Sequence, residues 1–242
     1  YSYNGDAVDE PSSSSQGYGE NPPAVGIDFF EGPYQDADSI DNPLTSNFSN
    51  AIDSLGIPYE GIGIGYGDGI VDNERFGMRR FVYYNNSGNQ INGEPSTPLH
   101  FYNYMNGIWK NGQKMAYGGD GVSAATGANL DIEADYMFPG DTDPFNWGTG
   151  GTTVEPWTEV TSGNPPADRR FIQAAGPFTL EPGDYNNITM GVVWARATAG
   201  DPEESVKLMR IADDKAQALF DNCFEIVSGP DAPDVAVQEL EN

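Results

Sequence analysis

The 242-residue sequence contains one cysteine, Cys223, and one histidine, His100. A single cysteine cannot form an internal disulfide, so the cysteine content gives no sign of an oxidising compartment. A single histidine excludes zinc motifs that need two, and any Ser-His-Asp or Cys-His pair would have to use His100. This residue lies beside Phe101 and Tyr102, where a packed or surface histidine is the simpler interpretation.

Basic residues are also scarce, because 11 Lys and Arg stand against 37 Asp and Glu, a net charge of −26. The largest basic clusters are Arg79-Arg80 and Arg169-Arg170, too small to bind phosphate backbones or anionic headgroups by counterion release. We therefore expect no nucleic acid and no membrane surface among the partners. The many negative side chains of such a surface repel one another, and bound divalent cations would neutralise part of this charge.

Long apolar runs are absent. No stretch of eighteen apolar residues occurs, so we expect a chain that is not membrane-embedded. There is no charged segment followed by an apolar signal sequence, and the first residue is Tyr1, so we interpret the chain as a mature or trimmed piece of a longer polypeptide. The composition, rich in Gly and Tyr and poor in Lys, is typical of a secreted, loop-rich β protein.

Three regions are expected along the chain. Residues 1–24 hold a serine run and three prolines, which predicts an extended linker or arm. Residues 25–228 are expected to form a single β-rich domain. Residues 229–242 carry prolines and then the alternating Val235 and Val237, which predicts a linker into a following β domain.

The domain is predicted to be mainly β with two helices, in a sandwich-like Greek-key or jelly-roll arrangement with long Gly/Asp-rich loops. Strands are expected at 25–30 and 77–86, more weakly at 135–138, and two or three within 171–197. A helix is expected over about 98–110, because the segment starts with Thr-Pro, ends with Gly and carries Leu99, Tyr102, Met105 and Trp109 at helical spacing.

The second helix is expected at about 205–225, with one apolar face packed on the sheet. That face comprises Val206, Met209, Ala212, Ala216, Leu219, Phe220 and Cys223. Cys223 would then be a buried, inert thiol.

Three acidic clusters lie in loops rich in Gly, Asn and Pro. They are Asp36, Asp38 and Asp41; Asp68, Asp72 and Glu74; and Asp141 and Asp143 with Asn146 nearby. A hard cation such as calcium takes six to eight oxygen ligands, and closely spaced carboxylates in a tight loop supply them. These eight acids are therefore predicted as ligands of structural calcium. The spacing does not match a complete EF-hand loop, and solvated acids or a turn salt-bridged through Arg79 or Arg80 are the simpler alternatives.

Paired carboxylates leave a second function open. Glycoside hydrolysis needs two acids about 5–10 Å apart, and Trp147 or Trp157 could stack on sugar rings. Because 37 acids offer many pairs, this signal is unspecific.

The order of several motifs resembles a known group of proteins. The motifs are DRRF at 168–171, GPFTLEPG at 176–183, VVWA at 192–195 and ADDKAQ at 212–217, followed by a Pro-rich junction. They resemble a conserved region of large, mostly uncharacterised secreted surface proteins of Bacteroidota, many exported by the type IX secretion system. In those proteins a fibronectin-type or immunoglobulin-like domain follows the junction.

The resemblance implies export and an extracellular or outer-membrane surface location, within a longer chain. It carries over no catalytic motif. We therefore expect a non-enzymatic, calcium-stabilised surface module that serves adhesion or complex assembly and contacts other cell-surface proteins or glycans. The alternative is a carbohydrate-active or carbohydrate-binding module, with glycoside hydrolase as the enzyme class.

Overall fold

The computed structural model describes residues 2–3, 21–59, 62–163, 168–200 and 203–225. The predicted linker at 229–242 and most of the predicted arm at 1–24 lie outside these residues. The strands are β1 (Ser2–Tyr3), β2 (Ala24–Glu31), β3 (Arg80–Asn85), β4 (Ala116–Tyr117), β5 (Asn129–Glu133), β6 (Arg169–Ala174) and β7 (Thr189–Ala195). The α-helices are α1 (Pro98–Met105) and α2 (Glu203–Asp221), and short 3-10 helices are Phe48–Asn50, Ala124–Thr126 and Trp147–Thr149.

The described strands form three small antiparallel sheets, ordered β1-β2-β7, β3-β6 and β4-β5. The predicted mainly β class with two α-helices is confirmed. The sheets do not establish the predicted sandwich, because long irregular loops separate them. None of the helices in the described part of the chain is both long and apolar enough to cross a membrane.

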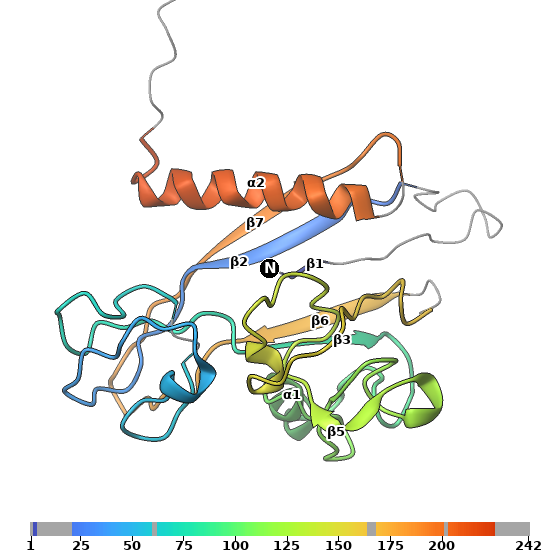
Figure 1. Ribbon diagram of the computed structural model, residues 1–242, viewed down its shortest axis with the longest axis horizontal. Coiled ribbons are helices and arrows are strands. Elements are labelled where there is room, and N and C mark those ends of the chain that lie inside the picture. Colours follow the sequence, from blue (N-terminus) through green and yellow to red (C-terminus); the bar gives the residue numbers. More distant parts are fainter. Residues whose placement is uncertain (1, 4–20, 60–61, 164–167, 201–202, 226–242) are drawn as a thin grey trace, which may run out of the picture.

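Helix α2 lies along β2 and β7 at one end of the molecule, and β3, β6, α1 and β5 lie at the other end (Figure 1). Glycine permits this close packing, since a Cβ on Gly26 would lie 2.3 Å from Met209 Sδ. At the far end of the helix, the rings of Phe30 and Phe220 stack with centroids 5.1 Å apart.

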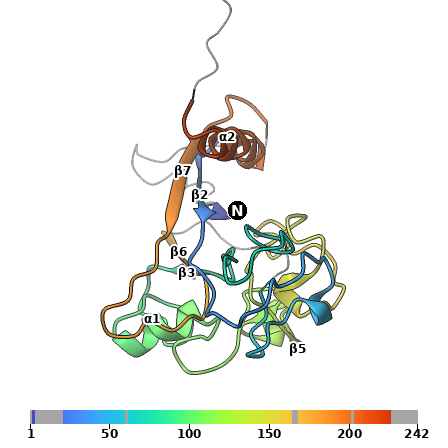
Figure 2. The same ribbon diagram turned by 90° about the vertical axis from the view of Figure 1, so that its left-hand side faces the viewer.

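The sheet beneath α2 has a second apolar face. The register pairs Val25 with Trp194, Ile27 with Val192 and Phe29 with Met190, and side chains of paired residues share a face. Figure 2 shows α2 end-on, with β7 and β2 beside it. On β7, Met190, Val192 and Trp194 are all more than half exposed.

The main hydrophobic core lies at the other end, around β3. Val82 and Tyr84 of β3 pack with Tyr104 of α1 and with Trp109. Trp109 is fully buried, and its indole N–H donates to the carbonyl of Gly121 at 2.8 Å. A second core cluster contains Tyr59, Tyr66, Phe76 and Trp147 beneath the long loops.

Three details of the predicted elements were wrong. Helix α1 ends at Met105 rather than near 110, because Asn106 caps it and Gly107 adopts a φ of +64°. Of its predicted apolar face, Leu99, Tyr102 and Met105 are exposed, whereas Trp109 is buried but lies beyond the helix. In place of a strand at 135–138, Tyr136 makes one parallel bridge to Phe81, and the strand is β5.

Cys223 also differs from its prediction. Helix α2 ends at Asp221, and Cys223 lies beyond it with a φ of +53° and is exposed. The buried residues of α2 are Ser205, Met209 and Asp213, spaced by four. The stripe on the sheet is therefore narrower and more polar than the sequence pattern indicated.

Candidate functional site: a cleft between α2 and the loop at 136–147

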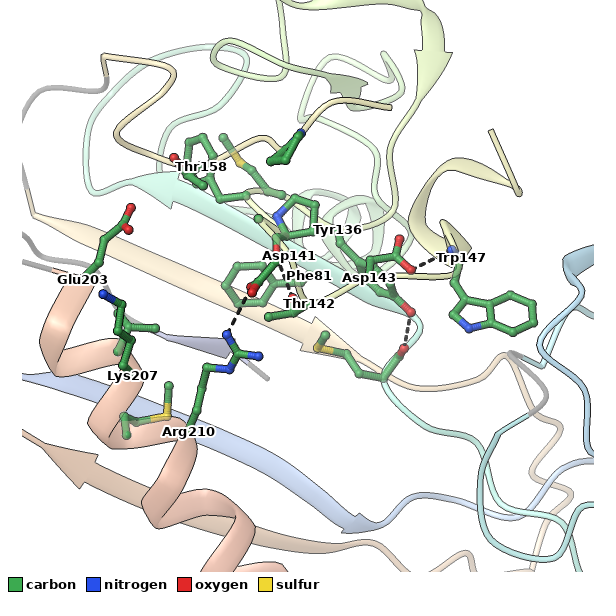
Figure 3. A pocket seen from close by; sticks show the side chains of 18 of the residues that line it. Phe81, Tyr136, Asp141, Thr142, Asp143, Trp147, Thr158, Glu203, Lys207 and Arg210 are labelled. Atoms are coloured by element: carbon green, nitrogen blue, oxygen red, sulfur yellow. Dashed lines mark hydrogen bonds and ion pairs between the residues drawn. The ribbon is translucent and has the colours of Figure 1, made fainter. Parts of the chain in front are cut away.

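A cleft of about 490 Å³ separates α2 from the loop at 136–147 (Figure 3). Its apolar lining comes from both ends of the molecule, with Met78, Phe81 and Tyr136 on one wall and Val206 and Met209 on the other. Large concave sites with an apolar lining and a few polar groups are where ligands usually bind.

One apolar wall is fixed by the strand bridge and by one hydroxyl. Tyr136 bridges Phe81 of β3, and its hydroxyl donates to the carbonyl of Met78 at 2.7 Å. This bond occupies the polar end of the tyrosine, so the ring is held beside the cleft (Figure 3). The wall is therefore preformed rather than assembled by a ligand.

Charged side chains line the rim. Glu203, Lys207 and Arg210 of α2 are spaced by four and three residues, which places them on one side of the helix. Arg210 reaches across the cleft and donates to Asp141 at 3.1 Å (Figure 3). Lys207 forms an ion pair with Glu204. Two of the 11 basic residues thus stand at this rim.

Asp143 has a local structural role in the wall of the cleft that faces α2. Its carboxylate accepts from the backbone amides of Trp147 and Gly148, each at 2.8 Å, and so holds the 3-10 helix at Trp147–Thr149. Burial raises the pKa of Asp143, although these amide bonds act in the opposite direction. The predicted pair Asp141 and Asp143 therefore lines one cleft, but the two carboxylates have different partners.

The other two acidic clusters meet each other, although about thirty residues separate them. Asp72 accepts from the amides of Asp38 and Ser39, both at 2.8 Å. In the opposite direction, Asp41 accepts from the amides of Gly67 at 2.8 Å and Gly69 at 2.7 Å. We call residues 36–42 and 67–74 the acidic loop pair.

A buried carboxylate closes the acidic loop pair. Glu74 is 2 % exposed and accepts from the amide of Asn42 at 2.6 Å. Asp36 instead accepts from the amide and hydroxyl of Thr179, each at 2.7 Å, and Asp68 accepts from the amide of Ile70 at 2.8 Å. Charge-assisted bonds of this kind are about twice as strong as neutral ones, so these carboxylates order long loops.

The hydrogen bonds of the acidic loop pair do not test whether calcium binds there. Within the described residues, no three His, Cys, Asp or Glu side chains gather where they could hold a metal ion. The amide bonds account for the order of the acidic loop pair without an ion. Calcium at the eight predicted acids remains a prediction.

The arginines after the middle cluster have other partners. Arg80 pairs with Asp135 at 3.0 Å, and Arg79 is buried. Arg75 donates to the carbonyls of Gly32 at 2.8 Å and Asn187 at 3.0 Å, and it stacks on the ring of Tyr34. Arg75 and Arg80 therefore tie separate segments together.

The other residues singled out from the sequence lie elsewhere. His100 of α1 contacts Ser96, which lies just before the helix, with Nδ1 at 3.3 Å from the Ser96 amide nitrogen and 3.4 Å from its Oγ. Trp147 and Trp157 are 5 % and 3 % exposed, so both pack in the core, as tryptophan more often does, and do not form exposed sugar platforms. The indole of Trp157 donates to Gly119 and Ser162 inside the core.

Sequence reasoning missed the cleft itself, because its walls come mainly from three segments that are distant in the sequence, at 78–81, 136–147 and 203–210. The only local signal is the spacing of Glu203, Lys207 and Arg210. The chain matches no protein-family model, no curated protein and no solved structure.

Proposed function

We propose that this chain is a non-enzymatic module of a larger secreted or outer-membrane-associated protein, serving adhesion or complex assembly at an extracellular surface. Its partner, a cell-surface protein or glycan, would bind in the cleft between α2 and the loop at 136–147. The observation that carries this proposal is the preformed apolar lining beneath a rim of both charge signs.

The exposed apolar side chains support a role in assembly. Leu99 and Tyr102 of α1 are each 62 % exposed, and Val192 of β7 is 70 % exposed. Exposed apolar patches of this kind mark interaction surfaces. In a chain with a net charge of −26, such uncharged areas are where a neighbouring domain can approach with least repulsion.

A carbohydrate ligand is the second candidate. It is favoured by the half-buried Tyr136, which lines the same cleft as Asp141 and Asp143, because an aromatic ring can bind a sugar face and carboxylates accept from sugar hydroxyls. Hydrolysis would need two carboxylates available to the glycosidic bond. Here Asp141 pairs with Arg210 and Asp143 accepts two backbone amides.

Site-specific photocrosslinking tests the cleft as the binding surface. A photoreactive amino acid at Lys207, on the rim, is expected to give a discrete adduct when the parent protein is illuminated in its native envelope. The same substitution at Lys215, exposed on the same helix but outside the cleft, is the matched control and should give none. Equal labelling from both positions, or none from Lys207, would contradict the proposal. Identification of the adduct as protein or glycan separates the two candidates.

A further inference from the structure

The face of α2 that lies on the sheet contains a buried carboxyl group. Asp213 is 1 % exposed and lies one turn beyond the fully buried Met209. Among the residues that the structure describes, neither carboxyl oxygen of Asp213 has a hydrogen-bond partner. By contrast Ser205, the other polar residue of this stripe, accepts from the amide of Ala197 at 3.0 Å.

The sheet places a second carboxyl group opposite. Asp28 of β2 alternates with Gly26 and Phe30, which contact Met209 and Phe220 of α2, so Asp28 faces the helix. The other ionisable side chain of β2, Glu31, accepts from the hydroxyl of Thr189 at 3.1 Å. Strand β7 carries no ionisable side chain.

Helix α2 itself supplies no compensating charge to Asp213. Arg210, one turn earlier, is engaged by Asp141 across the cleft, and the neighbouring Asp214 is exposed and also negative. A buried carboxylate without partners costs several kcal/mol, so the protonated form is favoured. Burial first, and then the charge of Asp28, raise the pKa of Asp213 to about 6. Burial also raises the pKa of Asp28.

We propose that Asp213 and Asp28 form a proton-operated latch, in which α2 lies on the sheet while Asp213 carries a proton and loosens when both carboxyls are ionised. The latch is a property of the fold and does not depend on the proposed function. It nevertheless affects the cleft, since Val206, Met209 and Arg210 of the same helix form one wall.

The direction of the effect follows from proton linkage. A carboxyl whose pKa is higher in the docked state than its ordinary value of 3.8 binds protons more tightly when α2 is docked. Docking is therefore strongest at pH below about 4, weakens as the pH rises from about 4 to about 6, and changes little above that. A rise from 3.8 to about 6 changes the opening equilibrium by on the order of 100-fold.

Hydrogen exchange, corrected for the intrinsic effect of pH, measures this opening. In the wild-type chain the amides of α2 around Met209–Gln217 are expected to lose protection by on the order of 30-fold between pH 4.5 and pH 7.5. Amides of β3 serve as an internal reference and should change little. Asp213→Asn cannot ionise and should remove this pH dependence, whereas Asp214→Asn, at an exposed position of the same helix, should retain it.

If Asp213→Asn weakens the docking of α2 at every pH, the loss of its pH dependence cannot be measured. A third variant then provides the test. Asp28→Asn removes the facing negative charge, which raises the pKa of Asp213, but leaves Asp213 titratable. The midpoint of the loss of protection should therefore move to lower pH, and the loss should be smaller. Protection of α2 that is independent of pH in the wild type would overturn the proposal. So would an unchanged pH dependence in Asp213→Asn, or an unchanged midpoint in Asp28→Asn.

Discussion

Replacement of Trp109 by alanine is expected to lower the free energy of unfolding by about 4 kcal/mol. The side chain is fully buried and packs edge-on against Tyr104 with ring centroids 5.7 Å apart. Its truncation leaves a cavity beneath β3 and also removes the donor to the Gly121 carbonyl. Denaturant unfolding followed by circular dichroism measures the change.

Trp194→Ala is the matched control, because it removes the same side chain from a position that is 61 % exposed. Its expected cost is under about 1 kcal/mol. Trp109→Phe should fall between the two, since it keeps much of the volume but not the indole N–H. Similar losses for Trp109→Ala and Trp194→Ala would mean that the core is not centred where the structure places it.

Replacement of Glu74 by alanine is expected to cost about 2–3 kcal/mol. The amide of Asn42 loses its acceptor inside the acidic loop pair, where Asn42 is 4 % exposed. Glu74→Gln keeps an acceptor oxygen and should cost less. Thermal or urea unfolding measures both changes.

A charge-matched control is needed because any loss of negative charge relieves repulsion in a chain of −26. Glu181→Ala provides it, since Glu181 is exposed. This control should be neutral or slightly stabilising. A Glu74→Ala variant as stable as Glu181→Ala would show that the buried hydrogen bond contributes nothing.

Elements with regular patterns were predicted well from the sequence. The apolar spacing located α2 to within a few residues, and the aromatic and β-branched run located β3. The errors in the helix bounds come from local backbone conformation that the apolar pattern does not reveal. At Gly107, for example, a left-handed backbone follows the end of α1, where the pattern predicted that the helix continues. The buried position of Asp213 could not be predicted from the sequence. The buried face of a helix is identified by its apolar residues, and a carboxyl group is therefore assigned to the surface.

Contacts between segments that are distant in the sequence could not be predicted from local patterns. Acid clustering identified loops that are structurally organised, but the backbone amides that their carboxylates bind were not predicted. The contacts of Asp41 with Gly67 and Gly69 depend on two loops meeting and on left-handed glycines there, with φ of +66° and +90°. Nothing periodic in either segment encodes that meeting, and the same is true of the two walls of the cleft.

Amide hydrogen exchange in EDTA is the most direct test of whether carboxylates alone order the acidic loop pair. With calcium removed, the amides of Ser39, Gly67 and Gly69 are expected to remain protected by at least about tenfold over an unstructured chain. Asp72→Ala should release Ser39 while Asp41 still protects the two glycines. Loss of protection at all three amides in EDTA, with recovery when calcium is added, would contradict this and would establish the predicted calcium site instead.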